Sequence, residues 1–387
     1  MGVLGHSSRM DFSLTEDQRL FSDSVQGFAE RYLAEGALAR AHAGTFPWDI
    51  AKLMAEHGLL GITIAEADGG QGGDLMDAII ATERIASVCP RSADVLQFGS
   101  FGPIRVLAEY GSDEQKSRVL AKLLAGEALI AVAMTESDAG SAVTDLRTTA
   151  TPDGEGFRIN GSKVFTSHGP EADFFLTYVR FGLGVGGIGS VLIERAADGF
   201  SNGKPTRYMS GDEWTPLFFD NLYVGPENVL LGEGGFKKQI AGFNVERMGN
   251  AARSLALGQF AFDVAREHAL TRQQFGRPLC EFQGLQWMLA DMSIQLEASR
   301  GLIYRAAKSA DIDGAWGFPD ALLGAQAKPF AAEMAIRVTN DALQVFGAKG
   351  YSRNTGIERI VRDARMFTIG GGTAQILRTM IASRILN

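Results

Sequence analysis

The stretch that decides the fold is Met366-Phe367-Thr368-Ile369-Gly370-Gly371-Gly372-Thr373-Ala374-Gln375-Ile376-Leu377-Arg378. Residues 366–369 are predicted to favour β structure, and Thr373 begins a run with helical spacing. Three adjacent glycines let the backbone approach a ligand closely or adopt positive φ. We expect Thr373 to cap the following helix and to leave N–H groups that suit an anionic ligand. Taken alone, the three glycines also fit a flexible turn between two helices.

Composition limits the classes to which the protein can belong. A chain of 387 residues is longer than one core usually serves, so two or three domains are expected. The formal charge of −8 argues against a nucleic-acid partner. Cys89 and Cys280 are too few for a disulfide framework or a metal cluster, which predicts a reducing, cytoplasmic setting and no metal site. Because no apolar run is long enough to span a bilayer, no membrane partner is predicted.

The first 130 residues are predicted to be helical, after a disordered extension over residues 1–9. Apolar periodicity and glycine stops predict helices at 13–34, 47–57, 74–88, 92–110 and 113–125. From residue 130 short strand-like segments follow one another without helices, at 130–134, 147–151, 156–163, 174–180, 190–194 and 217–224. Turn signals such as Asp153-Gly154 and Asn160-Gly161 separate them, which favours an antiparallel barrel or sandwich.

Longer helices return from Gly235, at about 235–273, 282–309, 319–347 and 355–385. Long antiparallel helices favour a bundle. The predicted fold class is therefore α+β. It consists of an N-terminal helical domain (1–130), a middle β-barrel or sandwich (131–234) and a C-terminal four-helix bundle (235–387).

Several separated motifs resemble the acyl-CoA dehydrogenase family, over nearly the whole chain. The glycine stretch, with Arg362-Asp363-Ala364 before it, resembles the C-terminal signature of that family. Residues 133–141 resemble its flavin loop, and residues 160–167 resemble the strand that covers the flavin ring. Residues 272–276 and 344–350 resemble segments that contact the FAD of a neighbouring subunit. The resemblance implies the family's fold, FAD as cofactor, and a homo-oligomer, either a dimer or a tetramer.

The resemblance also assigns ligand positions residue by residue. Met134 and Thr135 correspond to donors beside the flavin pyrimidine, and Ser167 corresponds to a hydroxyl near flavin N5. Phe165 stands where the family often has Trp, and Arg272 corresponds to a partner of the FAD pyrophosphate, which suits a guanidinium fork. Other FAD positions fall on Phe275, Gln283, Gln344, Gly347, Thr373 and Gln375. Ser141 and Arg247 correspond to positions near CoA.

The catalytic carboxylate of many family members is absent from its usual place, two residues before Thr373, where this chain has Gly371. Gly371 can offer its backbone N–H to a thioester carbonyl, but it cannot accept a proton. A branch that includes the isovaleryl-CoA dehydrogenases carries its Glu on an earlier helix and has a small residue at the position of Gly371. Glu246, in Phe243-Asn244-Val245-Glu246-Arg247-Met248, matches that arrangement and is the predicted base.

Residues 275–288 and 362–378 also look like the 3-sulfinopropionyl-CoA desulfinases, which keep the fold but break a C–S bond. Arg91 corresponds to the sulfinate-binding arginine of those enzymes, although a surface charge after a proline turn is an equally good interpretation. A carboxylate at Glu246 favours dehydrogenation.

The predicted function is FAD-dependent α,β-dehydrogenation of a short- or branched-chain acyl-CoA. Glu246 would take the α-proton, flavin N5 would accept hydride, and an electron-transfer flavoprotein would receive the electrons. The alternatives are a desulfinase-like lyase and a non-catalytic flavin-binding protein. The sequence leaves open the acyl length, branching and terminal group, and whether the thioester is carried by CoA or by a carrier protein.

Overall fold

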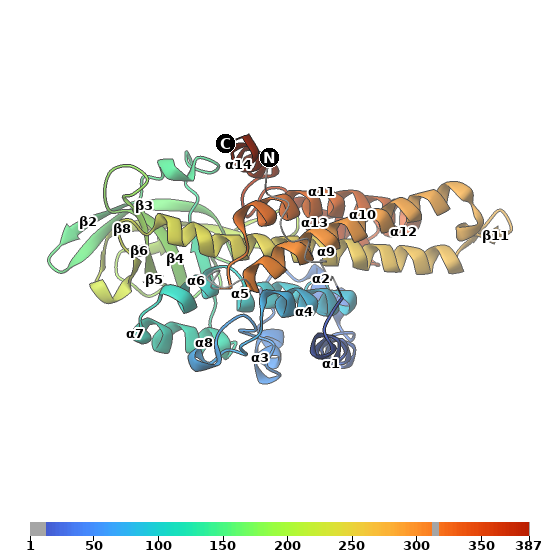
Figure 1. Cartoon of the computed structure of the whole chain (residues 1–387), viewed down its shortest axis with the longest axis horizontal. Coiled ribbons are helices and arrows are strands. Elements are labelled where there is room, and N and C mark those ends of the chain that lie inside the picture. The colour runs from blue at the N-terminus through green and yellow to red at the C-terminus, as the bar shows by residue number, and fades with distance from the viewer. Residues whose placement is uncertain (1–12, 312–316, 387) are drawn as a thin grey trace, which may run out of the picture.

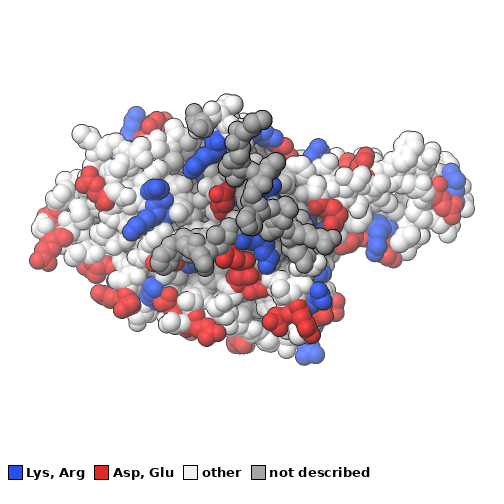
Figure 2. Space-filling model, viewed as in Figure 1, with Lys and Arg blue, Asp and Glu red and all other residues white. Residues whose placement is uncertain are grey.

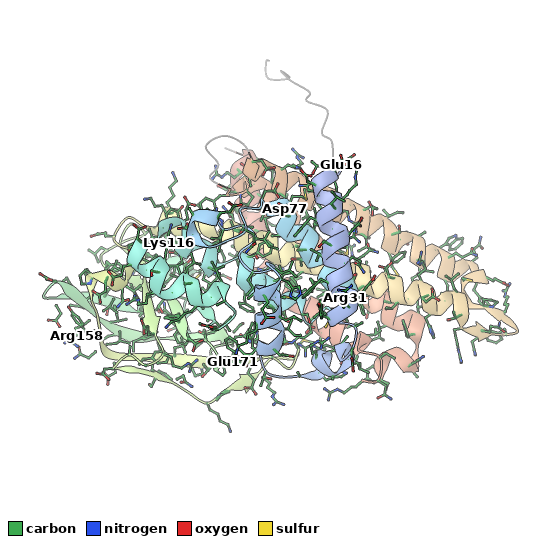
Figure 3. All side chains as sticks on the ribbon, turned by 90° about the horizontal axis from the view of Figure 1, so that it is seen from below. Glu16, Arg31, Asp77, Lys116, Arg158 and Glu171 are labelled. Carbon is green, nitrogen blue, oxygen red and sulfur yellow. The ribbon has the colours of Figure 1, made fainter. Side chains whose placement is uncertain are left out.

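The computed structural model describes residues 13–311 and 317–386. The predicted extension over residues 1–9 lies outside the described residues. The helices of the N-terminal part are α1 (Glu16–Tyr32), α2 (Ala37–His42), α3 (Trp48–Glu56), α4 (Leu75–Val88), α5 (Ala93–Ser100), α6 (Pro103–Tyr110), α7 (Asp113–Gln115) and α8 (Ala121–Leu124). Thr15 begins α1 with a capping box to Gln18. Glu16 and Arg31 lie toward opposite ends of α1 (Figure 3), which suits the helix dipole.

One helix predicted in this part is wrong. Residues 92–110 form two helices, α5 and α6, and not one. Gly102 adopts φ of 69°, and Pro103 has no N–H to continue the α5 hydrogen bonds. Pro103 lies at the first turn of α6, where a missing N–H costs nothing. The break places Pro103 beside the cavity described below.

The middle part is a nine-stranded sheet. Its strands are β1 (Ile130–Ala133), β2 (Thr149–Asp153), β3 (Gly156–Ser167), β4 (Phe174–Arg180), β5 (Ile188–Glu194), β6 (Phe200–Asn202), β7 (Thr206–Arg207), β8 (Glu213–Val224) and β9 (Val229–Leu231). The order is β6-β8-β3-β2-β4-β5-β9, with β1 paired to β4 and β7 to β8. Most pairs are antiparallel, and β1 and β2 each run parallel to β4.

One of the two predicted turns lies inside a strand. Asp153-Gly154 does form the turn between β2 and β3, with Asp153 paired to Gly156. Asn160-Gly161 lies within β3, where the register against β8 shifts and Gly161 has φ of 148°. Glycine therefore serves a β-bulge at this position, not a hairpin.

The C-terminal part contains the longest helices. They are α9 (Phe236–Thr271), α10 (Gln283–Lys308), α11 (Ala321–Phe346), α12 (Ala348–Tyr351), α13 (Ile357–Met366) and α14 (Ala374–Leu386), and a small hairpin of β10 (Gln273–Gln274) and β11 (Arg277–Pro278) joins α9 to α10. The predicted single helix over 355–385 is wrong, and so is the predicted β segment over 366–369. Met366 ends α13, a turn follows, and the Thr373 hydroxyl accepts from the Ile376 N–H at the start of α14. The three glycines belong to the turn before α14, in which Gly371 and Gly372 adopt positive φ.

Helix α9 organises the three parts. It packs against α4 on one side and against α10 and α11 on the other (Figure 1). Buried small side chains such as Ala252, Ala256 and Ala265 let these helices approach closely. One continuous cluster of buried apolar side chains includes residues of all three parts, among them Leu96, Ile159 and Leu255. Because the parts share a core, side chains from all three can be placed accurately around one cavity. The domain boundaries at 130 and 234 stay predictions.

The far ends of α9 and α10, with the β10–β11 hairpin, project from the body of the molecule (Figure 1). We call this projection the arm, and it covers residues 262–294. Its exposed apolar side chains are Leu270, Phe275, Trp287 and Ile294. Figure 2 shows that charges of both signs are scattered over the visible face, with much of the arm uncharged. No helix within residues 13–311 and 317–386 combines the length and the apolar character needed to cross a bilayer.

Candidate active site

A cavity of about 270 Å³ lies where the three parts meet. Its walls come from α5, from Pro103, from the strands β1 and β3 with the residues that follow β1, from α9, and from the turn after α13. Of the residues singled out from the sequence, it brings together Arg91, Met134, Thr135, Phe165, Ser167, Glu246 and Gly371.

Glu246 lies on the α9 wall of this cavity. Its Oε1 accepts hydrogen bonds from Gln97 Nε2 at 2.9 Å and from Asn250 Nδ2 at 3.4 Å. Burial raises the pKa of the Glu246 carboxyl, and the two amides with the charges of Lys328 and Arg253 oppose that rise only in part. Among residues 13–311 and 317–386, no cation forms an ion pair with Glu246. An unpaired carboxyl of raised pKa beside a cavity has the character of a general base.

The glycine turn faces Glu246, and two buried cations fix its backbone. Lys328 is fully buried on α11, and its Nζ donates to Gly370 O at 2.6 Å and to Gly372 O at 2.7 Å. Arg247 Nε donates to Gly371 O at 3.3 Å. Burial, with repulsion from Arg247, lowers the pKa of Lys328 to about 7 against the attraction of Glu246. Three successive carbonyls of the turn therefore accept hydrogen bonds from Lys328 and Arg247.

A second wall of the cavity is built from β1 and β3. Phe165 packs against Trp214 with 4.6 Å between ring centroids and the ring planes tilted by 45°, yet it stays 57% exposed. Both Phe165 and His168 have positive φ, at 56° and 53°, which is strained for these residue types. The Ser167 hydroxyl lies 3.4 Å from the Tyr208 hydroxyl, which donates to Phe165 O.

This wall fits a flat aromatic ligand with polar edges. Phe165 gives an apolar face, and the hydroxyls of Thr135 and Ser167 give hydrogen-bonding groups beside it. The fully buried Lys163 ties this wall to the segment after β1. Its Nζ donates to Met134 O at 3.1 Å and to Glu136 Oε1 at 2.8 Å. These residues would hold a flavin ring.

A third side of the cavity carries a network of paired charges. Arg91 is 3% exposed, and its guanidinium contacts Asp94 at 2.5 Å and Asp212 at 2.7 Å. Arg253 also pairs with Asp94, and Arg359 lies 3.0 Å from Asp212 and 2.7 Å from Asp363. Burial raises the pKa of Asp363 to about 7, against the attraction of Arg359. Three arginines and three aspartates are thus joined by ion pairs, and Arg91 is not the surface charge that the sequence allowed.

Comparison with known proteins identifies the chain. The family models described as the N-terminal, middle and C-terminal domains of acyl-CoA dehydrogenase match residues 15–127, 131–222 and 233–386. The chain belongs to the acyl-CoA dehydrogenase family. A 3-sulfinopropanoyl-CoA desulfinase of Paraburkholderia xenovorans is 38% identical over 97% of each chain. A short-chain specific acyl-CoA dehydrogenase of Clostridium acetobutylicum is 35% identical over 97% of this chain and 100% of its own.

The similarity extends to solved structures. Butyryl-CoA dehydrogenase from Megasphaera elsdenii superposes with a TM-score of 0.90 and 32% identity, over 98% of this chain and 100% of that one. The acyl-CoA dehydrogenase fold predicted from the motifs is confirmed.

Several positions that match FAD or CoA contacts of the family lie outside the cavity. Arg272, Phe275 and Gln283 are exposed on the arm, and Gln344 and Gly347 are exposed at the end of α11. Glu246 and Arg272 are separated by 26 residues of one helix, about 39 Å at 1.5 Å per residue. Within one chain these two residues cannot contact one small ligand fragment.

The remaining predicted site residues are also partly exposed and partly buried. Gln375 and Ser141 are exposed, and Thr373 caps α14 beside the glycine turn. Arg247 is buried and bonded to Asn244 Oδ1 at 2.6 Å as well as to Gly371 O. In this conformation Arg247 serves the turn, and not an exposed CoA site.

Sequence reasoning missed four residues that build the site, namely Gln97, Lys163, Asn250 and Lys328. Lys328 carried a signal, because a lone lysine within the alanine-rich run 325–335 stands where the helix pattern predicts burial. Asn250 carried a weaker one, as a polar side chain one turn after Glu246 on the same helix face. Gln97 had none, because its partners are about 150 residues away.

Proposed function

We propose that this protein catalyses the FAD-dependent α,β-dehydrogenation of a short- or branched-chain acyl-CoA, with Glu246 as the base. The observation that carries the proposal is the carboxyl of Glu246: it faces a cavity, has no ion-pair partner among the described residues, and is buried enough for its pKa to rise. A general base is most efficient when its pKa lies near the pH at which the enzyme works.

The α-proton of a thioester is weakly acidic, so its removal needs donors at the developing negative oxygen. In a trans peptide the N–H points away from the C=O. Because Lys328 binds Gly370 O, the N–H of Gly371 in the same peptide points away from Lys328. We infer that this N–H faces the cavity, which Gly370 and Gly371 line, and donates to the thioester oxygen.

FAD is the cofactor, and when bound it supplies the hydride acceptor at N5. Thr135, Phe165 and Ser167, which line the same cavity as Glu246, would hold its ring. A substrate between the two walls would lose its α-proton to Glu246 and a hydride from the β-carbon, so that two C–H bonds break and a C=C bond forms. An electron-transfer flavoprotein is the proposed acceptor of the electrons. The cytoplasmic location stays a prediction.

The arm supports a homo-oligomer, as a dimer or a tetramer, in which Arg272, Phe275 and Gln283 reach the FAD of a second subunit. Phe275 is 94% exposed, and Trp287 and Ile294 are exposed on the same arm, which marks the arm as an interaction surface.

Mixed oligomers test this contribution. When Glu246→Gln chains and Arg272→Ala chains are combined, activity should return, because some sites would receive Glu246 from one chain and Arg272 from the other. No regain after subunit exchange would contradict contribution from a second subunit.

A desulfinase-like lyase is the second candidate, because relatives of that name share 38% identity and Arg91 lines the cavity. The pairing of Arg91 weighs against it. A sulfinate would meet a guanidinium that Asp94 and Asp212 already neutralise, and it would lie close to those two carboxylates. A flavin-binding protein without turnover is the remaining alternative.

The test is anaerobic flavin absorbance against a panel of straight, branched, cyclic, dicarboxylic and sulfino acyl-CoAs, followed by thioesters on a carrier protein. We expect a saturated short or branched member to bleach the flavin. Sulfite release from the sulfino compound without bleaching would establish the lyase. No response from any member would favour the non-catalytic alternative.

A further inference from the structure

Asn250 connects the carboxylate of Glu246 with the glycine turn. It lies one turn after Glu246 on α9 and is 3% exposed. Its Nδ2 donates to Glu246 Oε1 at 3.4 Å, and its Oδ1 accepts from Gln97 Nε2 at 3.0 Å. Gln97 Nε2 also donates to Glu246 Oε1 at 2.9 Å. The two amides and the carboxylate form a closed triangle, in which both donors bind the same carboxylate oxygen.

Because Gly371 has no side chain, the amide of Asn250 can occupy the space beside it. A Cβ added to Gly371 would lie 2.4 Å from Asn250 Nδ2, whereas the next atom on another element, Lys328 Cε, would be 3.7 Å away. Contacts below 3.0 Å are essentially never seen for real Cβ atoms. A side chain at position 371 would therefore displace the Asn250 amide before it met anything else.

We propose that Asn250, together with Gln97, is a positioning residue for Glu246, and that position 371 is glycine because a side chain there would push Asn250 out of this triangle. The proposal rests on the proposed function, in which Glu246 removes the α-proton. It adds a physical reason why Glu246 and a side chain at position 371 exclude each other: the amide that orients Glu246 and a residue at 371 compete for one volume.

The triangle also favours the ionised form of the base, because both amides donate to it. The charged groups that face Glu246 are Lys328 on α11, Arg253 on α9 and, when ionised, Tyr178 on β4. None of these is altered when Asn250 changes. Removing the Asn250 amide should therefore raise the pKa of Glu246 through the lost hydrogen bond alone.

The test is a double-mutant cycle on the FAD-loaded enzyme, measured as the rate of flavin reduction by the substrate that the panel identifies. Asn250→Ala should lower this rate about 10- to 100-fold, as expected for a misplaced reacting group. It should also move the acid limb of kcat/KM upward by about one pH unit. Gly371→Ala should reproduce both effects. The two effects should not multiply: the double variant should lose much less than the product of the two single losses, because the displaced group is already absent.

Gly372→Ala is the matched control. Gly372 also has positive φ, at 90°, but its added Cβ would meet only ordinary contacts, with Leu377 Cδ2 at 3.6 Å and Arg247 at 3.8 Å. Both Gly371→Ala and Gly372→Ala therefore strain the backbone. The cost of that strain is the same with and without the Asn250 side chain, so it cancels from the coupling measured in each cycle. The effects of Gly372→Ala and Asn250→Ala should multiply. Multiplicative effects for Gly371→Ala as well, or an unmoved acid limb in Asn250→Ala, would overturn the proposal.

A second readout does not depend on turnover. The infrared carbonyl band of the protonated Glu246 carboxyl, identified by its loss in Glu246→Gln, can be titrated in the loaded enzyme without substrate. Its midpoint should move to higher pH in Asn250→Ala and in Gly371→Ala, and not in Gly372→Ala. If the midpoint moves while Glu246→Gln keeps full activity, the proposed function fails and the positioning role stands. If Glu246→Gln is inactive and the midpoint does not move, the positioning role fails.

Discussion

The two charged sides of the cavity are built in opposite ways. On the α9 side a single carboxylate, Glu246, accepts hydrogen bonds from the neutral amides of Gln97 and Asn250 and has no ion-pair partner within residues 13–311 and 317–386. On the other side every charge of the Arg91–Asp94–Asp212–Arg359–Asp363 network is paired within 3.0 Å. A carboxylate without a counter-ion can change its protonation state at small cost, whereas a carboxylate held between two arginines, as Asp94 is, resists protonation. The first arrangement suits proton transfer, and the second suits a rigid wall.

The largest expected effect tests the unpaired side. Glu246→Gln keeps the shape and removes the base, so the rate of flavin reduction should fall about 10²- to 10⁴-fold. The FAD content of the purified protein should not change, because Glu246 is not among the residues proposed to hold the flavin. Glu297→Gln, on the exposed face of α10, is the matched control and should have full activity. Full activity of Glu246→Gln would remove the base from this site.

The next effect tests the paired side. Arg91→Met leaves Asp94 and Asp212 each with one arginine fewer, so the free energy of unfolding should fall by about 3 kcal/mol. Urea unfolding of the loaded enzyme at neutral pH measures it. The matched control is Arg207→Ala, whose 3.1 Å pair with Glu213 leaves the arginine side chain 71% exposed, and which should cost less than about 1 kcal/mol.

The two candidate functions differ in how Arg91→Met should act on substrates. If Arg91 is part of a rigid wall, KM should change alike for neutral and for anionic acyl-CoAs. A rise in KM confined to dicarboxylic and sulfino substrates would show instead that the network opens to bind an anion.

The smallest effect is a pH dependence. Activity requires the ionised base, so kcat/KM should rise with pH through a limb above 4.5, the ordinary pKa of Glu, because burial raises the pKa of Glu246. Stability has the opposite slope. Between 4.5 and the raised pKa the native state retains a proton that the unfolded state loses, so the free energy of unfolding falls as pH rises. Glu246→Gln should abolish that contribution, and an unchanged slope in unfolding titrations of the variant would contradict the assignment.

The sequence predicted the helices and strands well where periodicity persisted, as in α4, β4, α9 and α11. It failed where one residue decides a break. Helices α5 and α6 were predicted as one because the apolar pattern continues across Gly102-Pro103, and α13 and α14 were predicted as one for the same reason across the glycine turn. A pattern of side chains reports which face is buried, and it does not report where the backbone changes direction.

By itself the sequence determined the family, the order of the three parts, and the complementary pair of Glu246 and Gly371, because these depend on motifs that are local in the chain. Only the tertiary structure decided that Gln97 and Asn250 share one oxygen of Glu246, that Lys328 fixes the glycine turn, and that Arg91 is neutralised. Apart from Asn250–Glu246 and Arg91–Asp94, which are four and three positions apart, these contacts join residues 42 to 153 positions apart. Such pairs are selected by packing of the whole chain around α9, and no local pattern encodes them.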